Sequence, residues 1–462
     1  EHMQPMTVRE IESAVGGVWW NPREDAPEVS AVSTDSRRLT PGCLFIPIKG
    51  ENFDGHDYIE AALDRGAAGV LCARLPEDLR PDRFYIKVDD TRFALKALAG
   101  AYRAKFNIPF VQITGSVGKT TTKEMIAAVL SQGLNVLKTP ENFNNDIGTP
   151  LTLLQLAPEH QAAVIETGMN HFGEIRYLGE MVRPDIAVIS NIGDAHIEFL
   201  GSREGILKAK SEIFEFLKPD GAAVLNGDDA LLNTLDLPFT TLRCGQSEHC
   251  GVRITDLSDH GLDGVTCRVT TARDEYELTI RAPGRHLAYC ASMAVAVGER
   301  LGLTHEQIVS GVAAFQGVGS RMEIIRLPGQ RIILNDCYNA NPQSVAAGLE
   351  VLAKSTGSRK VAILGDMGEL GEHGEAAHYN IGALAAMLGI DMVIAIGRKA
   401  EKIAEGTLAS GGSAVHFPDK DAAQAEILRQ FEPDTSVLVK ASHFSMHFET
   451  IVAFLREQNY QA

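Results

Sequence analysis

The chain has 462 residues, of which 45% are hydrophobic and 22% are charged, and its formal net charge is −17. This length corresponds to about three domains of roughly 150 residues each, and the composition is typical of a soluble, cytoplasmic globular protein. The acidic balance argues against a protein held on nucleic acid by a basic surface, no apolar run reaches the roughly 20 residues that span a membrane, and the seven scattered cysteines indicate neither a zinc site nor a disulfide framework.

The first hundred residues mix short β-type runs with short helical patterns. The β-type runs are Glu28–Ser33, Cys43–Ile48, Gly69–Cys72 and Phe84–Val88. A helix is predicted over Thr91–Lys105, and the turn at Asn107-Ile108-Pro109 begins a new unit. We therefore predict an N-terminal α/β domain over residues 1–104.

From Phe110 onward, apolar strands alternate with helical segments. The predicted strands are Phe110–Thr114, Ala162–Glu166, Ile186–Asn191 and Ala222–Asn226. Such alternation predicts a mostly parallel sheet covered by helices on both faces. Between Leu242 and Ala282 polar and β-branched residues alternate, which indicates antiparallel strands appended to that sheet. With a helix over His286–Leu301 and a linker at Ala313–Ser320, this central domain is predicted to span residues 105–318.

The remaining residues, 319–462, alternate in the same way. Their predicted strands are Arg331–Asn335, Lys360–Leu364, Met392–Ile396 and Ser436–Lys440. This pattern is typical of a second nucleotide-fold unit. The fold class is therefore α/β, with a smaller N-terminal domain, a central P-loop domain and a C-terminal Rossmann-like domain.

A phosphate-binding loop follows the first central strand. The strand ends at Thr114, a glycine-containing turn follows, and a helix begins after Lys119, so that backbone N–H groups and the helix N-terminus can face phosphate oxygens. Ile113 stands where the pattern GxxxxGK[ST] requires glycine, so the loop has the shorter GxxGKTT form, which argues against an ordinary GTPase or kinase. The residues predicted to bind ATP here are Gly115, Ser116, Val117, Gly118, Lys119, Thr120 and Thr121.

Three polar residues further along the chain are candidates for the chemistry. Glu166 ends a predicted strand at the edge of the sheet where ligands gather, and it could hold Mg²⁺ through its carboxylate. His196 follows the end of another strand, and Lys210 lies in a predicted helix, Gly205–Phe216. Taken singly, each has an ordinary interpretation: a strand-end acid, a surface or core histidine, and a solvated lysine.

Together these residues resemble the Mur ligase family. The segments Thr114–Thr121 and Ala209–Phe214, with Glu166 and His196 between them, occur in the order and spacing of that family. The resemblance implies that Lys119, Glu166, His196 and Lys210 are catalytic. It also implies two Mg²⁺ sites, held by Thr120, Glu166, His196 and Lys210, the last as a carbamate formed with CO₂.

Further motifs resemble the members of this family that add D-alanyl-D-alanine. These motifs are Asn142–Gly148, Asn335–Ser344 and Leu364–Gly371. The resemblance implies additional ATP contacts from Asn145, Arg321, Asp336 and Asn339. Two N-terminal segments, Ser33–Arg37 and Lys49–His56, are similar to those that cradle a UDP-sugar. The UDP-sugar residues implied are Thr34, Ser36, Arg37, Gly50, Asp54, Gly55 and His56.

The implied activity is an ATP-dependent ligation of D-alanyl-D-alanine to UDP-N-acetylmuramoyl-tripeptide through an acyl phosphate. Such a reaction serves peptidoglycan synthesis and hence cell shape and division, and we expect a monomer without nucleic-acid or membrane partners. Another amino-acid-adding ligase of the family and a P-loop regulatory ATPase are the alternatives. Whether the third residue of the peptide is lysine or diaminopimelate is left open.

Two segments depart from the family pattern. Leu287 and Cys290 stand where the family has the asparagines of GxHNxxN, so adenine must be recognised in another way. His443 replaces the arginine of a C-terminal KGSR segment, and a histidine there would make substrate affinity depend on pH. We expect hinges near Ala104–Asn107 and Ala313–Ser320.

Overall fold

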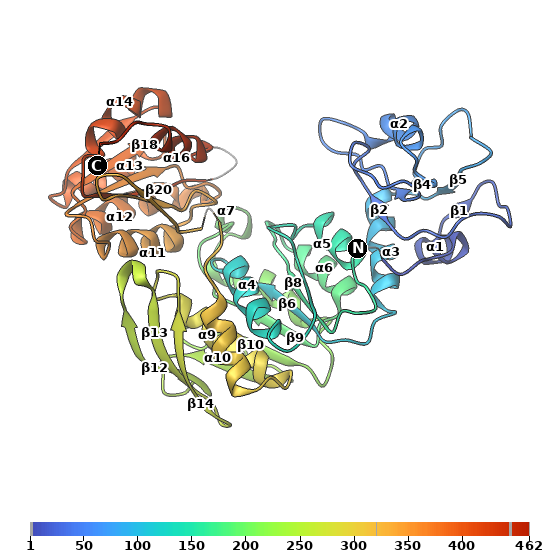
Figure 1. Ribbon diagram of the computed structural model, residues 1–462, viewed down its shortest axis with the longest axis horizontal. Coiled ribbons are helices and arrows are strands. Elements are labelled where there is room, and N and C mark those ends of the chain that lie inside the picture. The colour runs from blue at the N-terminus through green and yellow to red at the C-terminus, as the bar shows by residue number, and fades with distance from the viewer. Residues whose placement is uncertain (1–2, 320, 443–445, 462) are drawn as a thin grey trace.

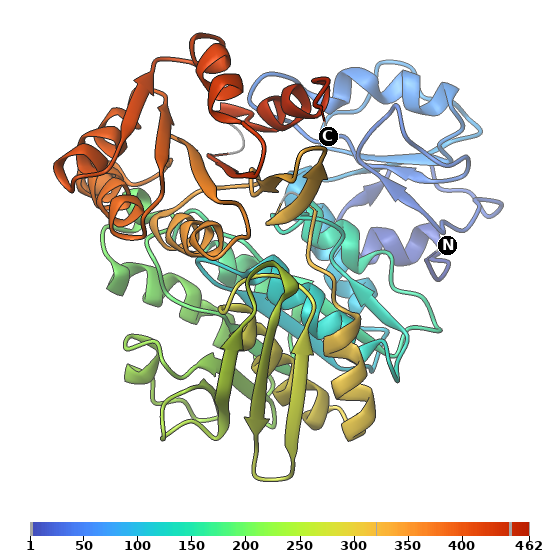
Figure 2. The ribbon, with the colours of Figure 1, turned by 60° about the vertical axis from the view of Figure 1, so that its left-hand side comes forward.

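A computed structural model describes residues 3–319, 321–442 and 446–461, so His443 lies outside the described residues. Three sheets, each with its own helices, follow one another along the chain (Figure 1). The predicted α/β fold is confirmed. The two outer domains lie on the same side of the central one, and Figure 2 shows them next to each other there. Among the described residues, no helix combines the length and apolarity that crossing a membrane requires.

The N-terminal domain is built on a five-stranded sheet of order β1-β5-β4-β3-β2. Its strands are β1 (Val18–Trp19), β2 (Val32–Ser33), β3 (Leu44–Phe45), β4 (Gly69–Cys72) and β5 (Phe84–Lys87), and its helices are α1 (Val8–Val15), η1 (Gly55–Tyr58), α2 (Ile59–Asp64) and α3 (Thr91–Arg103). Strands β2 to β5 are parallel, whereas β1 is antiparallel to β5. The expected run Cys43–Ile48 shortens to two paired residues, since Pro47 has no N–H to donate to a neighbouring strand.

The central sheet has nine strands in the order β14-β13-β12-β11-β10-β9-β6-β8-β7. These are β6 (Phe110–Thr114), β7 (Val136–Lys138), β8 (Ala162–Glu166), β9 (Ile186–Ile189), β10 (Ala222–Asn226), β11 (Thr240–Gly245), β12 (Val252–Asp259), β13 (Val265–Thr270) and β14 (Glu275–Ile280). The strands from β7 to β12 are parallel, and only β12, β13 and β14 pair antiparallel. The expectation of antiparallel pairing from Leu242 onward is therefore wrong for β11, which extends the parallel part.

Helices pack on both faces of this sheet. They are α4 (Lys119–Leu130), α5 (Gly148–Leu153), α6 (Glu174–Val182), α7 (Ile197–Leu200), α8 (Arg203–Lys210), η2 (Ser211–Phe214), η3 (Leu232–Thr234), η4 (Gly261–Asp263), α9 (Leu287–Arg300) and α10 (His305–Ala314). Helix α10 was not predicted, although Thr304 and Gln307 form a capping box at its start. Since α10 ends at Ala314, the linker to the third domain begins at Phe315, which is buried against the central core.

The third domain has a six-stranded sheet of order β15-β16-β20-β17-β18-β19, parallel except for β15. Its strands are β15 (Glu323–Leu327), β16 (Arg331–Asn335), β17 (Arg359–Gly365), β18 (Met392–Ile396), β19 (Ala414–Phe417) and β20 (Thr435–Lys440). Its helices are α11 (Pro342–Ala353), η5 (Gly371–His373), α12 (Gly374–Met387), α13 (Glu401–Ala409), α14 (Lys420–Gln430) and α16 (Glu449–Arg456).

Arg103 stabilises the junction between the first two domains. Its buried guanidinium donates to the carbonyls of Val182, at 2.7 Å, and of Phe106 and Arg183, both at 3.1 Å. It also lies 3.6 Å from the centre of the Phe110 ring. Helix α3 is therefore fastened to the central domain before the segment at Ala104–Asn107 begins, and a rotation at that segment would break these contacts.

Replacing Arg103 with methionine should lower the free energy of unfolding by about 2–4 kcal/mol, because buried carbonyls lose their donors. The urea midpoint of the purified variant measures this effect. Arg429→Met is the matched control, since the Arg429 side chain is 72% exposed and pairs only within its own helix. Equal midpoints for the two variants would contradict the role given to Arg103.

Candidate functional site

The phosphate loop lies at the carboxyl edge of the central sheet, between β6 and α4. Gly118 has φ +78°, a conformation that favours glycine, and a side chain on Gly115 would collide with the Ser190 hydroxyl. The segment after β9 braces the loop: the Asn191 side chain accepts from the Val117 N–H at 2.9 Å, and the Ser190 hydroxyl donates to the Val117 carbonyl at 2.7 Å. The loop is thus held in shape ahead of the N-terminus of α4, which is an arrangement suited to a phosphate group.

Glu166 ends β8, the strand on one side of β6, and is completely buried. One carboxylate oxygen accepts from the Thr120 hydroxyl at 2.7 Å, and the other accepts from the Asn144 amide at 2.6 Å. Two residues predicted to hold Mg²⁺, Thr120 and Glu166, are therefore in direct contact. Asn144 was not predicted, and its only sequence signal was its place in the segment Asn142–Gly148.

A buried cation lies close to the Glu166 carboxylate. The ammonium of Lys123, fully buried in α4, lies 3.3 Å from Glu124 and 3.7 Å from Glu166. It also donates to the carbonyls of Thr139 and Glu141 at 2.8 and 2.7 Å. It therefore ties the segment after β7 to the phosphate-loop helix and balances the charge of Glu166. Sequence reasoning missed Lys123, which sits in the ordinary helical pattern that follows the loop.

Lys119 and Lys210 form a pair of like charges near this edge. Burial lowers the pKa of the Lys119 ammonium, with Glu166 opposing the shift and Arg321 adding to it. Burial lowers the pKa of Lys210 well below its usual value, and the nearby cation Lys119 lowers it further. Lys210 ends α8 and is 2% exposed, so the interpretation as a solvated lysine is wrong. No carboxylate among the described residues pairs with it.

His196 lies beyond the end of β9, the strand on the other side of β6 from β8. It has a left-handed backbone, φ +64°, and precedes α7. Its ring nitrogen Nδ1 is in ion-pair contact with the carboxylate of Glu369, which belongs to the third domain. The predicted ligands Glu166 and His196 therefore flank the phosphate loop on opposite sides.

The described residues contain no cluster of three or more histidine, cysteine, aspartate or glutamate side chains able to enclose a metal ion. This arrangement suits Mg²⁺, which commonly takes one or two carboxylates and completes its shell with phosphate oxygens and water. The buried Glu166 with the Thr120 hydroxyl against it is such a partial set. A magnesium ion accompanying a nucleotide therefore fits here.

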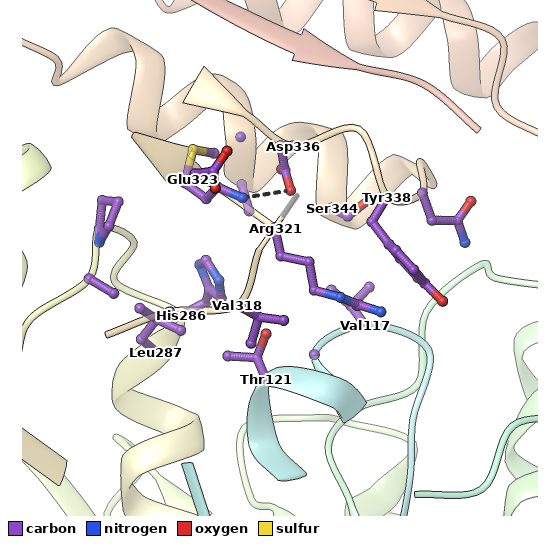
Figure 3. Close-up of a pocket in the computed structure, with 18 of the residues that line it drawn as sticks. Val117, Thr121, His286, Leu287, Val318, Arg321, Glu323, Asp336, Tyr338 and Ser344 are labelled. Carbon is purple, nitrogen blue, oxygen red and sulfur yellow. Dashed lines mark hydrogen bonds between the residues drawn. The ribbon is translucent and has the colours of Figure 1, made fainter. Parts of the chain in front are cut away.

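A cleft of about 420 Å³ separates the phosphate loop from the third domain. Figure 3 shows the Arg321 guanidinium between the Tyr338 ring and Val117 of the loop, and the guanidinium lies 3.7 Å from the ring centre. Burial lowers the pKa of Arg321, with Glu166 opposing the shift. The predicted ATP residues that line the cleft are Ser116, Val117, Gly118, Lys119, Thr121, Arg321, Asp336 and Asn339.

Asp336 is engaged within the third domain, although it borders the cleft. One carboxylate oxygen accepts from the Met322 N–H at 3.1 Å, and the other accepts from the buried Lys440 ammonium at 2.9 Å. Lys440 also donates to the Asn339 carbonyl at 2.9 Å. In this structure Asp336 fixes the backbone beside Arg321 and shapes the cleft, and Lys440 was not predicted.

Three predicted ATP residues do not line the cleft. Gly115, in the loop, and Thr120, in the first turn of α4, are both buried. The Asn145 side chain accepts from the N–H groups of Ile147 and Gly148, at 3.1 and 2.8 Å, and so shapes the start of α5. Its neighbour Asn144 is the residue that reaches Glu166.

The two N-terminal segments predicted to bind a UDP-sugar follow β2 and β3, which are adjacent parallel strands, and therefore lie at one edge of that sheet. The His56 ring is occupied on both nitrogens, by Asp54 at 2.7 Å and by the Ala73 N–H at 3.0 Å. Arg37 is exposed and pairs with Asp35 at 3.0 Å. The remaining predicted residues here are Thr34, Ser36 and Gly50, all half-buried, and Gly55, which is buried.

The two departures from the family pattern near α9 have different surroundings. Leu287 lines the cleft beside His286, so it offers an apolar surface to whatever binds there. The Cys290 thiol is buried and accepts from the Thr122 hydroxyl at 3.4 Å. Cys290 therefore joins α9 to α4 and is not among the residues that line the cleft.

Comparison with known proteins gives a consistent relationship along the chain. Residues 28–103 match the description "Mur ligase family, catalytic domain", residues 113–298 match "Mur ligase middle domain" and residues 320–443 match "Mur ligase, glutamate ligase domain". The UDP-N-acetylmuramoyl-tripeptide--D-alanyl-D-alanine ligases of Escherichia coli and Bacillus subtilis are each 37% identical to the chain. They cover 93% and 98% of it, and the matches cover 94% and 98% of those proteins.

Solved structures give the same result. A crystal structure of MurF from Acinetobacter baumannii has a TM-score of 0.92 and 32% identity, covering 99% of this chain and 100% of that one. The MurF ligase from Thermotoga maritima, solved in complex with ADP, has a TM-score of 0.81 and 28% identity, with 92% and 97% covered.

Replacing Lys123 with methionine should lower the free energy of unfolding by about 3–5 kcal/mol, because the buried charge of Glu166 loses a cation that Glu124 also contacts. The melting temperature by calorimetry is the measurement. Lys138→Met serves as the control, since Lys138 is 48% exposed and its ion pair with Glu124 contributes less than about 1 kcal/mol. If both variants have the melting temperature of the wild type, Lys123 is not needed to stabilise the buried charge of Glu166.

Proposed function

The chain belongs to the Mur ligase family, and we propose that it uses ATP to join D-alanyl-D-alanine to UDP-N-acetylmuramoyl-tripeptide. The products are ADP, phosphate and UDP-N-acetylmuramoyl-pentapeptide, a precursor of peptidoglycan. The observation that carries this function is the cleft in which the phosphate loop faces Arg321 of the third domain. The near full-length similarity to ligases of this activity supports the same substrates.

In the first step the terminal carboxylate of the tripeptide attacks the γ-phosphorus of ATP. The bond from that phosphorus to the bridging oxygen breaks, and ADP leaves. Both reactants are anions, so the protein must offset their repulsion before they can meet. Lys119 in the loop and Arg321 opposite it are two of the cations that line the cleft, one from each side, and we assign them this role.

In the second step the amine of D-alanyl-D-alanine attacks the carbonyl carbon of the acyl phosphate. The carbon–oxygen bond to phosphate breaks, the nitrogen loses a proton, and inorganic phosphate leaves. The acyl phosphate would react with water if water reached it, so the protein must hold the amine in place and exclude solvent. The arrangement of the two outer domains around the central edge supports closure over the reacting groups.

We assign magnesium to the edge formed by Thr120, Glu166 and His196. When bound, Mg²⁺ would neutralise phosphate charge and polarise the γ-phosphoryl group. Glu166 supplies the carboxylate, Thr120 supplies the hydroxyl that already touches it, and Asn144 fixes the orientation of the carboxylate.

We assign a carbamate to Lys210. A neutral amine is the form that attacks CO₂, and burial beside Lys119 favours that form by lowering the pKa of Lys210. The resulting carbamate would be an anion next to a cation, which removes the like-charge contact and adds an oxygen ligand for a second magnesium. Burial of this lysine, with no acidic partner among the residues that the structure describes, supports the assignment.

The N-terminal domain, residues 1–104, is assigned to the UDP-sugar, the central domain, residues 105–318, to ATP, and the third domain, residues 319–462, to closing the site. Thr34, Ser36, Arg37, Gly50, Asp54 and Gly55 are retained as the UDP-sugar residues. His56 acts there through Asp54, because its ring nitrogens are engaged. All these parts come from one chain, which supports a monomer, and the use of ATP supports the cytoplasm as the compartment.

ADP release should require both UDP-N-acetylmuramoyl-tripeptide and D-alanyl-D-alanine, and mass spectrometry should detect their condensation product. Lys119→Ala should lower kcat by roughly 10²–10³, as for the loss of one charge-stabilising group. Lys138→Ala, at an exposed position, is the control. ADP release that is equally fast without either substrate would overturn the ligase function in favour of a regulatory ATPase.

Carbon-13 NMR after equilibration with labelled CO₂ should give one carbamate resonance that disappears in Lys210→Met. The same variant should retain its fold, because methionine fills the buried site without an unpaired cation, and should lose ligase activity. Lys208→Met, two residues away, should keep the resonance. A wild-type spectrum without the resonance would exclude the carbamate and leave the ligase function standing.

A further inference from the structure

The segment between β9 and α7 lies between the phosphate loop and the third domain. On one side, the Gly193 N–H donates to the Ser116 hydroxyl of the loop at 2.7 Å. On the other side, the next residue, Asp194, contacts Gln343 of α11: its N–H donates to the Gln343 side chain at 3.1 Å, and its carboxylate accepts from the same amide at 2.7 Å. One short segment therefore touches both the ATP-binding loop and the third domain.

The end of this segment meets a second part of the third domain. The carboxylate of Glu369 contacts Nδ1 of His196, and the Glu369 carbonyl accepts from the Glu198 N–H at 3.0 Å. Glu369 lies between β17 and η5 in a left-handed conformation, φ +61°, and His196 has φ +64°. Two uncommon backbone conformations thus bring one carboxylate and one imidazole together across a domain boundary.

The contact of Glu369 with one ring nitrogen of His196 determines which nitrogen can bind a metal. A histidine that binds a metal through one ring nitrogen usually carries a carboxylate or carbonyl at the other, which fixes the orientation of the ring and raises its basicity. With Glu369 at Nδ1, Nε2 is the atom left for a ligand. Glu369 contacts His196 directly, and its charge also reaches Lys119 of the phosphate loop, where it opposes the lowering of the Lys119 pKa. A test of Glu369 must therefore separate its effect through His196 from its effect on Lys119.

We propose that Glu369 is a positioning residue that orients His196 for magnesium, so that the metal site of the central domain is complete only when the third domain is docked. This inference rests on the proposed role of His196 as a metal ligand. It makes docking of the third domain and metal binding at the phosphate loop a single coupled event. Gln343 stabilises the same segment through Asp194 without touching the metal ligand.

The test is Mn²⁺ affinity in the presence of ADP, measured by electron paramagnetic resonance on the full chain. Glu369→Gln keeps the size of the side chain and removes its charge, and the dissociation constant should rise roughly 10-fold. In steady state the same variant should show a raised KM for Mg²⁺, with kcat largely restored at saturating Mg²⁺. A general loss of folding would instead lower kcat at every Mg²⁺ concentration.

Two controls separate positioning from other effects. Glu372→Gln removes a charge from the same turn, at a side chain that is 89% exposed and pairs only with His373 at 3.8 Å. Lys354→Met removes a different contact between the domains, the 3.0 Å ion pair with Asp259. Both should leave Mn²⁺ affinity within about twofold of wild type, a change of less than about 0.5 kcal/mol.

A double-mutant cycle decides whether Glu369 acts through His196. On a His196→Ala background, Glu369→Gln should have no further effect on Mn²⁺ affinity. The proposal is overturned if the Glu369 effect persists without His196, if His196→Ala binds Mn²⁺ like wild type, or if Lys354→Met weakens affinity as much as Glu369→Gln. The Mn²⁺ measurement contains no tripeptide, so it does not depend on ligase activity. If the double-mutant cycle gives the expected result but the protein forms no pentapeptide, the proposed function is refuted and the positioning role stands.

Discussion

Glu166 carries a carboxylate at the completely buried end of a central strand, and such a group is stable there only when its surroundings satisfy both oxygens. Thr120 and Asn144 donate to it, and Lys123 lies near it. These contacts fasten the start of α4 and the segment after β7 to the same strand end. The phosphate loop, the metal edge and the floor of the cleft therefore take their shape from a single desolvated charge.

In the rest of the site, the reaction requires several negatively charged groups to come together. A carboxylate, a triphosphate and a peptide must approach one another, and the cations that offset their repulsion come from different domains, Lys119 from the centre and Arg321 from the third domain. Neither domain alone provides both. The protein thus links chemistry to domain arrangement, and the segment after β9, held by the loop on one side and by Gln343 and Glu369 on the other, is where that link is built.

The sequence predicts structural features that depend on residues close together in the chain. Several strands, such as β6 and β8, have the predicted bounds because a buried parallel strand is a continuous apolar run with a sharp end. Contacts between distant segments were not predictable in this way: Lys123 and Glu369 carry no local signal. Lys210 taken singly has the pattern of a solvated lysine, because burial by other elements leaves no mark on its own helix, and only the family resemblance identified it as a candidate. Asn144 and Asn145 are adjacent, and only the fold distinguishes their roles.

The acyl phosphate is the centre of this account, and oxygen transfer tests it most directly. If the terminal carboxylate of the tripeptide is labelled with oxygen-18, its attack on ATP places one labelled oxygen between carbon and phosphorus. The amine then expels phosphate carrying that oxygen. The account predicts one labelled oxygen in the inorganic phosphate for each amide bond formed. Phosphate released without label, while the pentapeptide is made, would contradict it.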